Sequence, residues 1–364
     1  MMRKLSFFPG VGLILAGCFG AWSVMSEAAS VVPFWGIAVE GVEITEERLL
    51  QVEKETGLAP QIVLFFLQWP ADPDRISNRD EIAAFPLSSV EAIWRRGAIP
   101  CVTWEPMYYD PSGKEQMIGY QGILRGLYDP YLTAFARQAG RWGKPLMIRF
   151  AHEMNLSRYH WGTDARAFGT ESPEIYRKMY RYVVSVFKRE GATNVLWVFC
   201  PNAESIPNPR HDKTASWNDV RRYYPGDQWV DVLGMDGYNW GTTQTKENHG
   251  WDSSWRSFAE IFQPLYEELK ILSPGKPLFV FETSTVGSGG DKAQWIREAF
   301  ETVRRWKIQG LVWFQVKKEL DWLIQSEGDN THISVIRSAS SSVQDWAQSL
   351  KMSATPRKES LKGP

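Results

Sequence analysis

The chain has 364 residues and a formal net charge of −1, because 41 Lys and Arg nearly balance 42 Asp and Glu. This length is enough for one large domain or two ordinary ones. The balanced charge excludes the basic field that binding to nucleic acid or to anionic lipid requires. Aromatic residues are abundant, at 18 Trp, 13 Tyr and 18 Phe, which is typical of a large core or of a surface that stacks on sugar rings.

The first 29 residues are predicted to be an export signal. Two basic residues near the start precede an uncharged stretch from Leu5 to Ser26, as in secretory signals. Cys18 after Leu-Ala-Gly resembles a lipoprotein signal, in which the cysteine is lipidated, whereas the small residues around Ala28 and Ala29 fit an ordinary signal peptidase. The stretch also approaches the roughly 20 residues of a membrane anchor. All three alternatives place the rest of the chain outside the cytoplasm, as a secreted, periplasmic or membrane-anchored protein.

From Pro33 onward, short apolar runs alternate with longer amphipathic segments, a pattern typical of βα units and a parallel sheet. The predicted strands, in chain order, are 34–39, 61–67, 99–104, 146–155 with its polar end, 195–199, 229–235, 277–281 and 310–314. The predicted helices are 45–55, 87–96, 130–142, 173–190, 255–272, 291–305 and 333–350. Asp291 is predicted to be the N-cap of the helix that follows the seventh strand.

Eight such units, with no linker-like change of composition between residues 33 and 350, predict a single α/β domain folded as a (β/α)8 TIM barrel. The long loops after the third to sixth strands are expected to build its active-site face. Cys101 and Cys200 fall in the third and fifth strands, which are not neighbours in a barrel, so two free buried thiols are predicted. Residues 351–364, rich in Lys, Ser and Pro, are predicted to be a disordered tail. The protein is expected to be a monomer.

Two predicted strands end in a glutamate. The apolar run from Leu146 stops in Arg149-Phe150-Ala151-His152-Glu153-Met154-Asn155, and the run from Pro277 to Phe281 leads into Glu282. Charged groups are costly to bury without a partner, so their place at the ends of buried strands indicates a functional site. Cleavage of a glycosidic bond needs one protonated carboxyl and one ionised carboxylate. A salt bridge to a neighbouring Arg is the structural alternative for each glutamate.

Tryptophans and polar side chains follow other strand ends. Candidates for surfaces that stack on sugars, with ordinary core packing as the alternative, are Trp104, Trp161, Trp240 and Trp313. Candidates for contacts with sugar hydroxyls, with a structural role as the alternative, are Glu105, Asn202 and Asp236.

The run from Arg149 to Asn155, followed by Tyr159-His160-Trp161-Gly162, resembles the fourth-strand signature of glycoside hydrolase family 26. Later strand ends match the same family in the same order, at Asp236-Gly237-Tyr238-Asn239, Phe281-Glu282-Thr283 and Val312-Trp313-Phe314. That family is best known for β-mannanases and includes lichenase-type enzymes that cut mixed-linkage β-glucan. The resemblance implies a (β/α)8 barrel, in agreement with the eight units above, and a reaction that needs no metal or other cofactor.

The resemblance also implies roles for single residues. Glu153 would be the general acid/base and Glu282 the nucleophile of a retaining mechanism, with Tyr238 hydrogen-bonded to the nucleophile. The two carboxyls are then expected about 5 to 5.5 Å apart. Burial would favour the protonated form of Glu153, and Tyr238 with Arg149 nearby would favour the ionised form of Glu282.

Further residues would contact the substrate. The resemblance places Trp313 under the sugar at the cleavage site, with His152 and Trp161 lining the same subsite. Arg149 and Asn155, from the same run as His152, complete the candidate substrate-binding set.

The chain departs from the family pattern after Asn155. Family members often have Gly and then Trp there, where this chain has Leu156 and Arg158. The missing aromatic leaves the identity of the sugar open. Arg158 is expected either to form a surface ion pair or to contact the substrate.

These observations predict a retaining, endo-acting β-glycanase that acts on a polysaccharide. β-1,4-Mannan is the leading substrate, and mixed-linkage β-glucan or an exopolysaccharide is the alternative. A non-catalytic carbohydrate-binding lipoprotein is the alternative of another class. A metal-dependent hydrolase is disfavoured because His152-Glu153 lacks a second His four residues on, so no metal site is predicted.

Overall fold

The computed structural model describes residues 32–41, 43–72, 85–162, 169–325 and 342–354. The predicted export signal and most of the predicted tail lie outside these ranges. Within them, no helix is long and apolar enough to cross a membrane.

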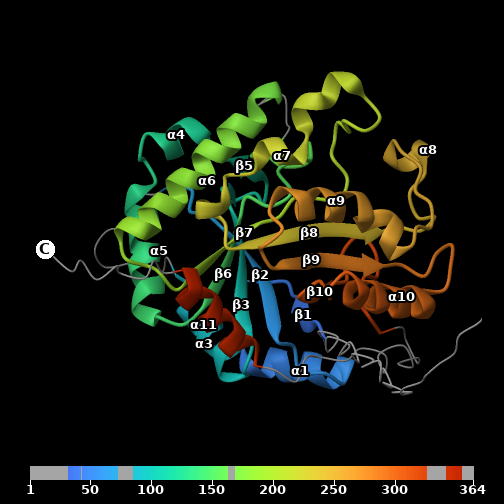
Figure 1. Cartoon of the computed structure of the whole chain (residues 1–364), viewed down its shortest axis with the longest axis horizontal. Coiled ribbons are helices and arrows are strands. Elements are labelled where there is room, and N and C mark those ends of the chain that lie inside the picture. Colours follow the sequence, from blue (N-terminus) through green and yellow to red (C-terminus); the bar gives the residue numbers. More distant parts are fainter. Residues whose placement is uncertain (1–31, 42, 73–84, 163–168, 326–341, 355–364) are drawn as a thin grey trace, which may run out of the picture. The chain divides into compact units, whose positions relative to one another are not determined.

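Eight parallel strands close into a barrel (Figure 1). In order around the barrel they are β1 (Phe34–Ala38), β2 (Ile62–Gln68), β3 (Ile99–Glu105), β6 (Leu146–Phe150), β7 (Val195–Phe199), β8 (Val232–Asn239), β9 (Leu278–Thr285) and β10 (Gly310–Phe314). β10 returns to β1, with Phe34 opposite Gly310. The closed barrel confirms the predicted fold and the order of its strands.

Helices connect the strands and pack on the outside of the barrel (Figure 1). The longer ones are α1 (Glu46–Thr56), α3 (Leu87–Arg95), α5 (Asp129–Trp142), α6 (Ser172–Arg189), α9 (Phe258–Leu272), α10 (Lys292–Arg305) and α11 (Val343–Ala354). The shorter ones are α4 (Tyr120–Leu124), α7 (Val220–Tyr223) and α8 (Lys246–His249). An antiparallel hairpin of β4 (Met107–Tyr109) and β5 (Glu115–Met117) follows β3. Asp291 caps α10 as predicted, since its side chain accepts from the backbone N–H of Gln294.

β8 and β9 extend well beyond their predicted bounds at the end that carries polar residues, whereas β2 and β3 gain one residue each there. β8 begins later than predicted, at Val232, and continues through Asp236 to Asn239, while β9 continues past Glu282 to Thr285. The two extensions pair with each other, and the Asn239 amide donates to Thr285 Oγ1 over 2.9 Å. Ladder and side-chain hydrogen bonds thus satisfy polar groups that a hydropathy pattern assigns to a loop.

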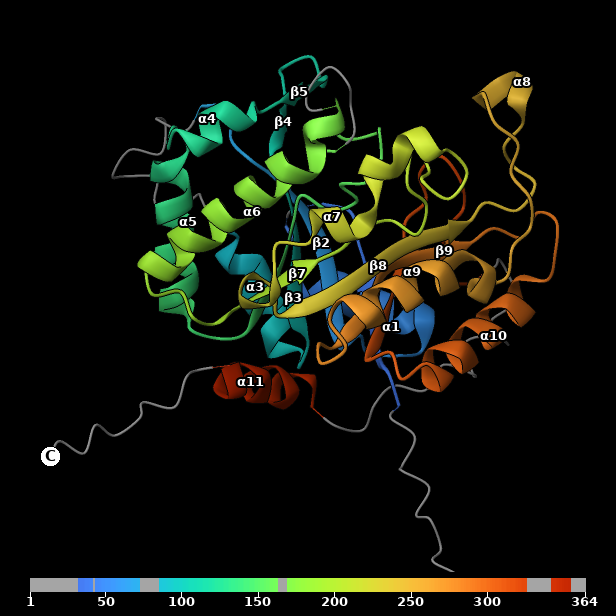
Figure 2. The same ribbon diagram turned by 45° about the horizontal axis from the view of Figure 1, so that its top comes forward.

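Helix α11 packs against the N-terminal ends of barrel strands (Figure 2). The ring centroid of Trp346 lies 5.6 Å from that of Phe34 and 5.3 Å from that of Phe279. The predicted last helix, 333–350, begins at Val343 within the described residues, and its earlier part lies outside them. The helix runs on to Ala354, so residues 351–354 of the predicted tail are helical.

Strand side chains divide between the barrel interior and the layer under the helices. In β10, Val312 and Phe314 belong to the interior, whereas Trp313 belongs to the core beneath the helices. This is the period of two that strand geometry imposes. Cys101 and Cys200 both lie in the interior, buried and free as predicted. The interior is therefore filled with apolar side chains, and the polar and charged groups gather at the strand ends.

Candidate active site

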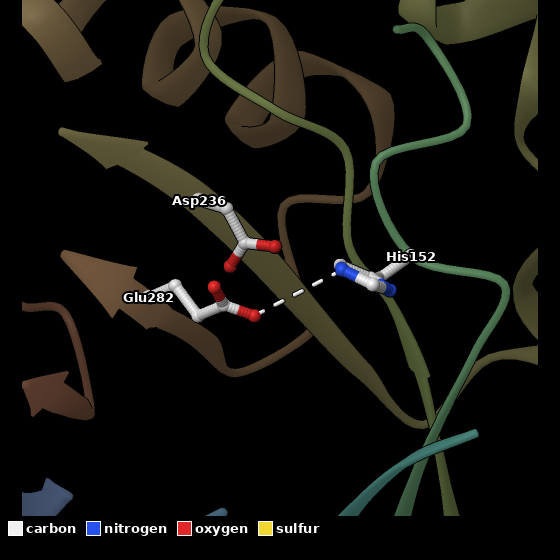
Figure 3. Close-up of side chains that lie close together, drawn as sticks. All are labelled: His152, Asp236 and Glu282. Carbon is white, nitrogen blue, oxygen red and sulfur yellow. Dashed lines mark ion pairs between the residues drawn. The ribbon is translucent and has the colours of Figure 1, made fainter. Parts of the chain in front are cut away.

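A buried arginine organises the C-terminal ends of the barrel strands. Arg149 from β6 donates to the carboxylates of Asp236 from β8 and Glu282 from β9, and to Thr103 Oγ1. Asp236 and Glu282 are paired residues of neighbouring strands (Figure 3). Burial lowers the pKa of Arg149, but the charges of Asp236 and Glu282 outweigh burial and hold that pKa well above its ordinary value. A permanent cation therefore lies between two buried carboxylates.

Glu282 is buried and has a donor on each carboxylate oxygen. Arg149 donates to Oε1, and the Tyr238 hydroxyl donates to Oε2 over 2.6 Å. Burial, and next the charge of Glu282, raise the pKa of Tyr238 well above its ordinary value, so the phenol keeps its proton. The predicted contact between Tyr238 and Glu282 is thus present. Donors on both oxygens stabilise the negative charge and fix the orientation of the carboxylate.

Glu153 follows β6 and has different surroundings. Its buried carboxyl accepts from Asn202 Nδ2 over 2.5 Å and also hydrogen-bonds to the Tyr159 hydroxyl. Burial, and next the negative charge of Glu282, raise the pKa of Glu153 to about 7. A carboxyl with such a pKa can hold a proton at neutral pH and can also release it.

The backbone at Glu153 is strained. Ala151, with φ of 49°, and Glu153, with φ of 51°, lie in the left-handed region, which is uncommon for residues that carry a Cβ. Each such residue costs about 1–3 kcal/mol, and such residues cluster at functional sites. Neighbouring strands hold the turn, since the Ala151 N–H donates to the Trp104 carbonyl and the Glu153 N–H donates to the Cys200 carbonyl. The fold therefore maintains this turn against local strain.

His152, between the two strained residues, is buried and faces Glu282, with 4.0 Å between Nε2 and Oε1 (Figure 3). Neither ring nitrogen has a hydrogen-bond partner among the described residues. Burial, and next the charge of Arg149, lower the pKa of His152 well below its ordinary value, so the ring is neutral with one donor and one acceptor. Unpaired buried polar groups are costly, so a ligand hydroxyl suits this position.

His152, Asp236 and Glu282 each offer one ligand atom within 4.8 Å of the others, a spacing that a metal ion could bridge (Figure 3). The Arg149 guanidinium already donates to both carboxylates. A divalent cation bound here would face that positive charge at short range in a buried site, which opposes binding. The donor set therefore fits a carboxylate pair neutralised by arginine better than it fits a metal centre.

Comparison with known proteins points to one family. The family model described as "Glycosyl hydrolase family 26" matches residues 131–265, a range that includes Glu153 and Asp236. Endoglucanase H from Acetivibrio thermocellus is 32% identical over 290 residues, which are 79% of this chain and 28% of that protein. These matches support glycoside hydrolase family 26 as the family of this chain.

Other relatives agree with the family assignment. A mannan endo-1,4-beta-mannosidase from Bacillus subtilis is 28% identical over 172 residues, which are 42% of this chain and 43% of that enzyme. The chain thus spans less than half the length of either relative.

Solved structures share the barrel. A Bacillus subtilis mannanase superposes with a TM-score of 0.53 at 16% identity, over 79% of this chain and 81% of that one. The family 26 domain of an endo-beta-mannanase/endo-beta-glucanase from Prevotella bryantii superposes with a TM-score of 0.56 at 16% identity, over 84% of this chain and 93% of that one. At such identities the likeness shows the fold alone.

Two tryptophans predicted to contact sugar lie elsewhere in the barrel. Trp104 and Trp313 are fully buried beneath the helices. Trp104 Nε1 donates to the Tyr131 hydroxyl of α5 over 2.9 Å, and the Trp313 ring lies 6.2 Å from that of Trp295 in α10. Alternate residues of a strand face opposite sides and these two face the helices. Their burial supports the core-packing alternative.

A different set of aromatic side chains surrounds Tyr238, next to Glu282. Phe314 of β10 stands perpendicular to the Tyr238 ring at 5.6 Å, and Trp322 lies 5.2 Å from it. Trp322 also packs on half-buried Trp240, which lies 5.9 Å from Trp251. Trp251 is 46% exposed. Trp240 thus stays a candidate for stacking on sugar, and Trp251 joins it, although the polar loop around Trp251 carries no sequence signal for this role.

Trp161 supports the site from behind. Its indole N–H donates to the His152 carbonyl over 2.7 Å, and its ring stacks on Tyr159 at 4.6 Å. Tyr159 in turn faces the His152 ring at 4.8 Å and bonds to Glu153. Tyr159 therefore borders His152 and Glu153 more directly than the predicted Trp161 does. It belongs to the family motif quoted above, which is the signal that could have identified it.

Three polar residues predicted to contact substrate are fully buried and bonded to protein groups. Arg149 and Asp236 form the ion pair described above, and Asp236 also approaches Cys200 Sγ at 3.2 Å. Asn155 donates from its amide to the Asn202 carbonyl and accepts from the Asn202 N–H, each over 2.9 Å. These contacts support a structural role for Arg149, Asn155 and Asp236, because each uses its polar atoms to hold the site together.

Asn202 and Glu105 lie at the site itself. Asn202 is half-buried and donates to Glu153, so its side chain serves the predicted acid/base. Glu105, at the end of β3, accepts from Gln68 Nε2 over 2.5 Å. Burial raises the pKa of Glu105 to about 7, and the charge of Glu282 contributes to the rise. Glu105 therefore stays a candidate for contact with a sugar hydroxyl.

Arg158, where family 26 members often carry an aromatic, forms an ion pair. It donates to both carboxylate oxygens of Glu115 at 3.1 and 3.0 Å, and its guanidinium lies over the Tyr159 ring at 5.2 Å. Since Glu115 belongs to β5, the pair ties the β4–β5 hairpin to the loop after Glu153. The side chain of Arg158 is 59% exposed, so the ion-pair alternative is the one that the geometry supports.

Proposed function

We propose that the protein is a retaining, endo-acting β-glycanase, with Glu282 as nucleophile and Glu153 as general acid/base. The observation that carries this proposal is the contrast between the two carboxyls. Glu282 has an arginine and a phenol as donors, whereas Glu153 is buried with a pKa of about 7. A retaining reaction needs this pairing of an anionic nucleophile with a protonated acid.

The reaction has two steps. In the first, an oxygen of Glu282 attacks the anomeric carbon, the bond to the leaving oxygen breaks, and Glu153 transfers its proton to that oxygen. In the second, Glu153 takes a proton from water as the water oxygen attacks the anomeric carbon and releases Glu282. Each residue ends in its starting protonation state, and the sugar keeps its anomeric configuration.

Asp236 provides Arg149 with a second counter-ion during this reaction. Glu282 loses its charge when it becomes an ester, which would leave a buried guanidinium without a counter-ion. Asp236 also pairs with Arg149, so the cation would keep one counter-ion in the intermediate. Arg149 can therefore stabilise Glu282 as an anion without preventing the ester from forming.

His152 and the aromatic surface supply contacts for the sugar. His152 offers an unpaired donor and acceptor 4.0 Å from Glu282, which suits a hydroxyl next to the anomeric carbon. Trp240 and Trp251 present aromatic area beside Tyr238. Flat faces of this kind stack on sugar rings, and they would bind units away from the cleaved bond.

β-1,4-Mannan is the leading substrate, and mixed-linkage β-glucan is the second. The names of the relatives, which include mannan endo-1,4-beta-mannosidases and an endoglucanase, support both. Arg158 stands where an aromatic residue is common in the family, and this difference favours keeping mixed-linkage β-glucan as the alternative substrate. The test is reducing-end release from mannan, glucomannan, lichenan, β-1,3-xylan and cellulose, with Glu282→Ala as the blank. Turnover of a polymer by wild type alone supports the proposal, and no turnover of any polymer contradicts it.

The export of the protein is a separate proposal. The uncharged stretch after the basic start of the chain and Cys18 after Leu-Ala-Gly support a signal with a lipid anchor, and the small residues near Ala28 support simple cleavage. Mass spectrometry of the mature N-terminus distinguishes them, since only the lipoprotein begins with a modified Cys18. An unprocessed N-terminus in the cytoplasm would contradict export.

A further inference from the structure

Asn202 connects Glu153 to the strand beside it. Its amide nitrogen donates to Glu153 Oε1 over 2.5 Å. The Glu153 backbone N–H donates to the carbonyl of Cys200 over 2.8 Å, two residues before Asn202. The segment after β7 thus holds both the side chain and the backbone of Glu153.

The orientation of the Asn202 amide is determined by a second contact. The backbone N–H of Glu204 donates to Asn202 Oδ1 over 2.8 Å. Turning the amide over would set its NH2 group against that N–H, with no acceptor between them. The nitrogen end must therefore face Glu153, and Asn202 is a donor to Oε1 in every protonation state of the carboxyl.

Asn202 is itself held in place by buried groups. The Asn155 amide bonds to its backbone N–H and carbonyl, each over 2.9 Å, and donates to Ser205 Oγ over 3.1 Å. The next residue, Ala203, donates its N–H to the Asp236 carbonyl over 2.7 Å. The position of the Asn202 side chain is consequently set by two strands and by a fully buried amide.

A protonated carboxyl has one oxygen that only accepts and one that carries the proton. The Asn202 N–H cannot accept a hydrogen bond, so the oxygen that faces it must be the accepting one. The Tyr159 hydroxyl, the other partner of the carboxyl, can either donate or accept and so tolerates both states. The contact with Asn202 alone therefore distinguishes the two oxygens of Glu153.

We propose that Asn202 is a positioning residue that keeps the exchangeable proton of Glu153 on Oε2. Its role in catalysis rests on the proposed function, because only then is that proton the one delivered to the leaving oxygen and recovered from water. The placement of the proton does not depend on any substrate. Asn202 would thus act through Glu153, and not by touching the sugar as the sequence predicted.

The first test measures the ionisation of Glu153 directly. In protein labelled with ¹³C at the glutamate side-chain carboxyl, the Glu153 resonance is assigned by its loss in Glu153→Gln and followed against pH. A donor to a carboxylate favours its ionised form, so Asn202→Ala should raise the pKa of Glu153 by about one unit. An unchanged or lowered pKa overturns the proposal.

A second variant and a control accompany this test. Asn202→Asp keeps the shape but loses the donor when ionised, so it should raise the apparent pKa of the carboxyl pair further, even if Asn202→Ala folds poorly. Asn208→Ala makes the same change in the same loop, at a side chain whose amide nitrogen bonds to Glu204. It should leave the pKa of Glu153 at its wild-type value. If Asn208→Ala shifts that pKa as much as Asn202→Ala does, the shift comes from a general loosening of the loop and the proposal is overturned.

The second test measures catalysis. In Asn202→Ala, the high-pH fall of kcat/KM should move upward by the same shift, and cleavage of polysaccharide at the optimum should slow by about 10- to 100-fold. An aryl glycoside with a good leaving group needs no proton in the first step, so its cleavage should slow much less. Equal slowing of both substrates overturns the positioning role. A wild type without glycanase activity refutes the proposed function instead, and the titration still decides the placement of the proton.

Discussion

The two strand-end glutamates are the same residue type and are both buried, yet their partners differ. Glu282 accepts from a permanent cation and a phenol, whereas Glu153 accepts from a neutral amide and bonds to the Tyr159 phenol. The guanidinium of Arg149 is bonded to Glu282 and Asp236, so Glu153 receives its charge only at longer range. Both glutamates are buried, so burial does not explain why one is suited to be the nucleophile and the other the acid. The position of the Arg149 cation, bonded to Glu282 and not to Glu153, explains the difference.

The largest expected effect comes from removing the carboxylate that bonds to the sugar. Glu282→Ala should lose at least about 10⁴-fold in kcat on polysaccharide, measured by reducing-end release. Glu174→Ala, at an exposed carboxylate on α6 that pairs with Lys178, is the matched control and should keep its activity. Azide should restore cleavage of an activated aryl glycoside by Glu282→Ala and give a glycosyl azide of inverted configuration. Activity near that of the control would exclude Glu282 as nucleophile.

Removing the cation should act first on stability. Arg149→Met leaves Asp236 and Glu282 buried without a counter-ion, so the free energy of unfolding should fall by about 3–5 kcal/mol. Urea denaturation followed by circular dichroism measures the change. Adding Asp236→Asn to Arg149→Met should recover part of the loss, because one buried charge fewer then lacks a partner. If the double variant is less stable than Arg149→Met, Asp236 has another function than balancing the cation.

Glu153→Gln should affect one class of substrate more than another. Without a proton donor, kcat/KM on polysaccharide should fall by about 10²- to 10⁴-fold, while formation of the intermediate from an activated aryl glycoside should change little. In wild type, kcat/KM should fall as pH rises through the Glu153 pKa of about 7, because the acid loses its proton. That fall should be absent in Glu153→Gln. Loss of the same size on both substrates would argue against Glu153 as the acid.

The barrel could be predicted from sequence because its buried strands are continuous apolar runs separated by amphipathic helices. The prediction failed where polar residues continue a strand, as at Asp236 to Asn239 and at Glu282 to Thr285. Those residues form hydrogen bonds with one another between β8 and β9. A hydropathy pattern cannot predict a hydrogen-bond partner on another strand.

The two glutamates of the proposed catalytic pair could be selected from sequence for a similar reason, since both follow apolar runs and stand in a recognisable motif. Which neighbours face them was not. Trp313 and Phe314 are adjacent in sequence, and only the register of β10 decides that Phe314 is the inner one. The contact between Glu153 and Asn202 joins residues 49 positions apart. Such pairings follow from the order of strands around the barrel and become visible only when the barrel closes.

The smallest expected effect isolates one donor on the nucleophile. Tyr238→Phe removes the bond to Glu282 Oε2 but keeps the ring that packs on Phe314 and Trp322. Loss of a hydrogen bond to a charged oxygen costs about 1.5–3 kcal/mol, or about 10- to 100-fold in kcat/KM. The melting temperature should stay near that of wild type, whereas Tyr238→Ala, which also loses the ring, should melt lower. Because Arg149 still holds Glu282, and Glu153 keeps its own partners, the high-pH fall of kcat/KM should stay in place. If that fall moves instead, Tyr238 acts on the acid as well as on the nucleophile, and the separation between the two glutamates is weaker than their contacts indicate.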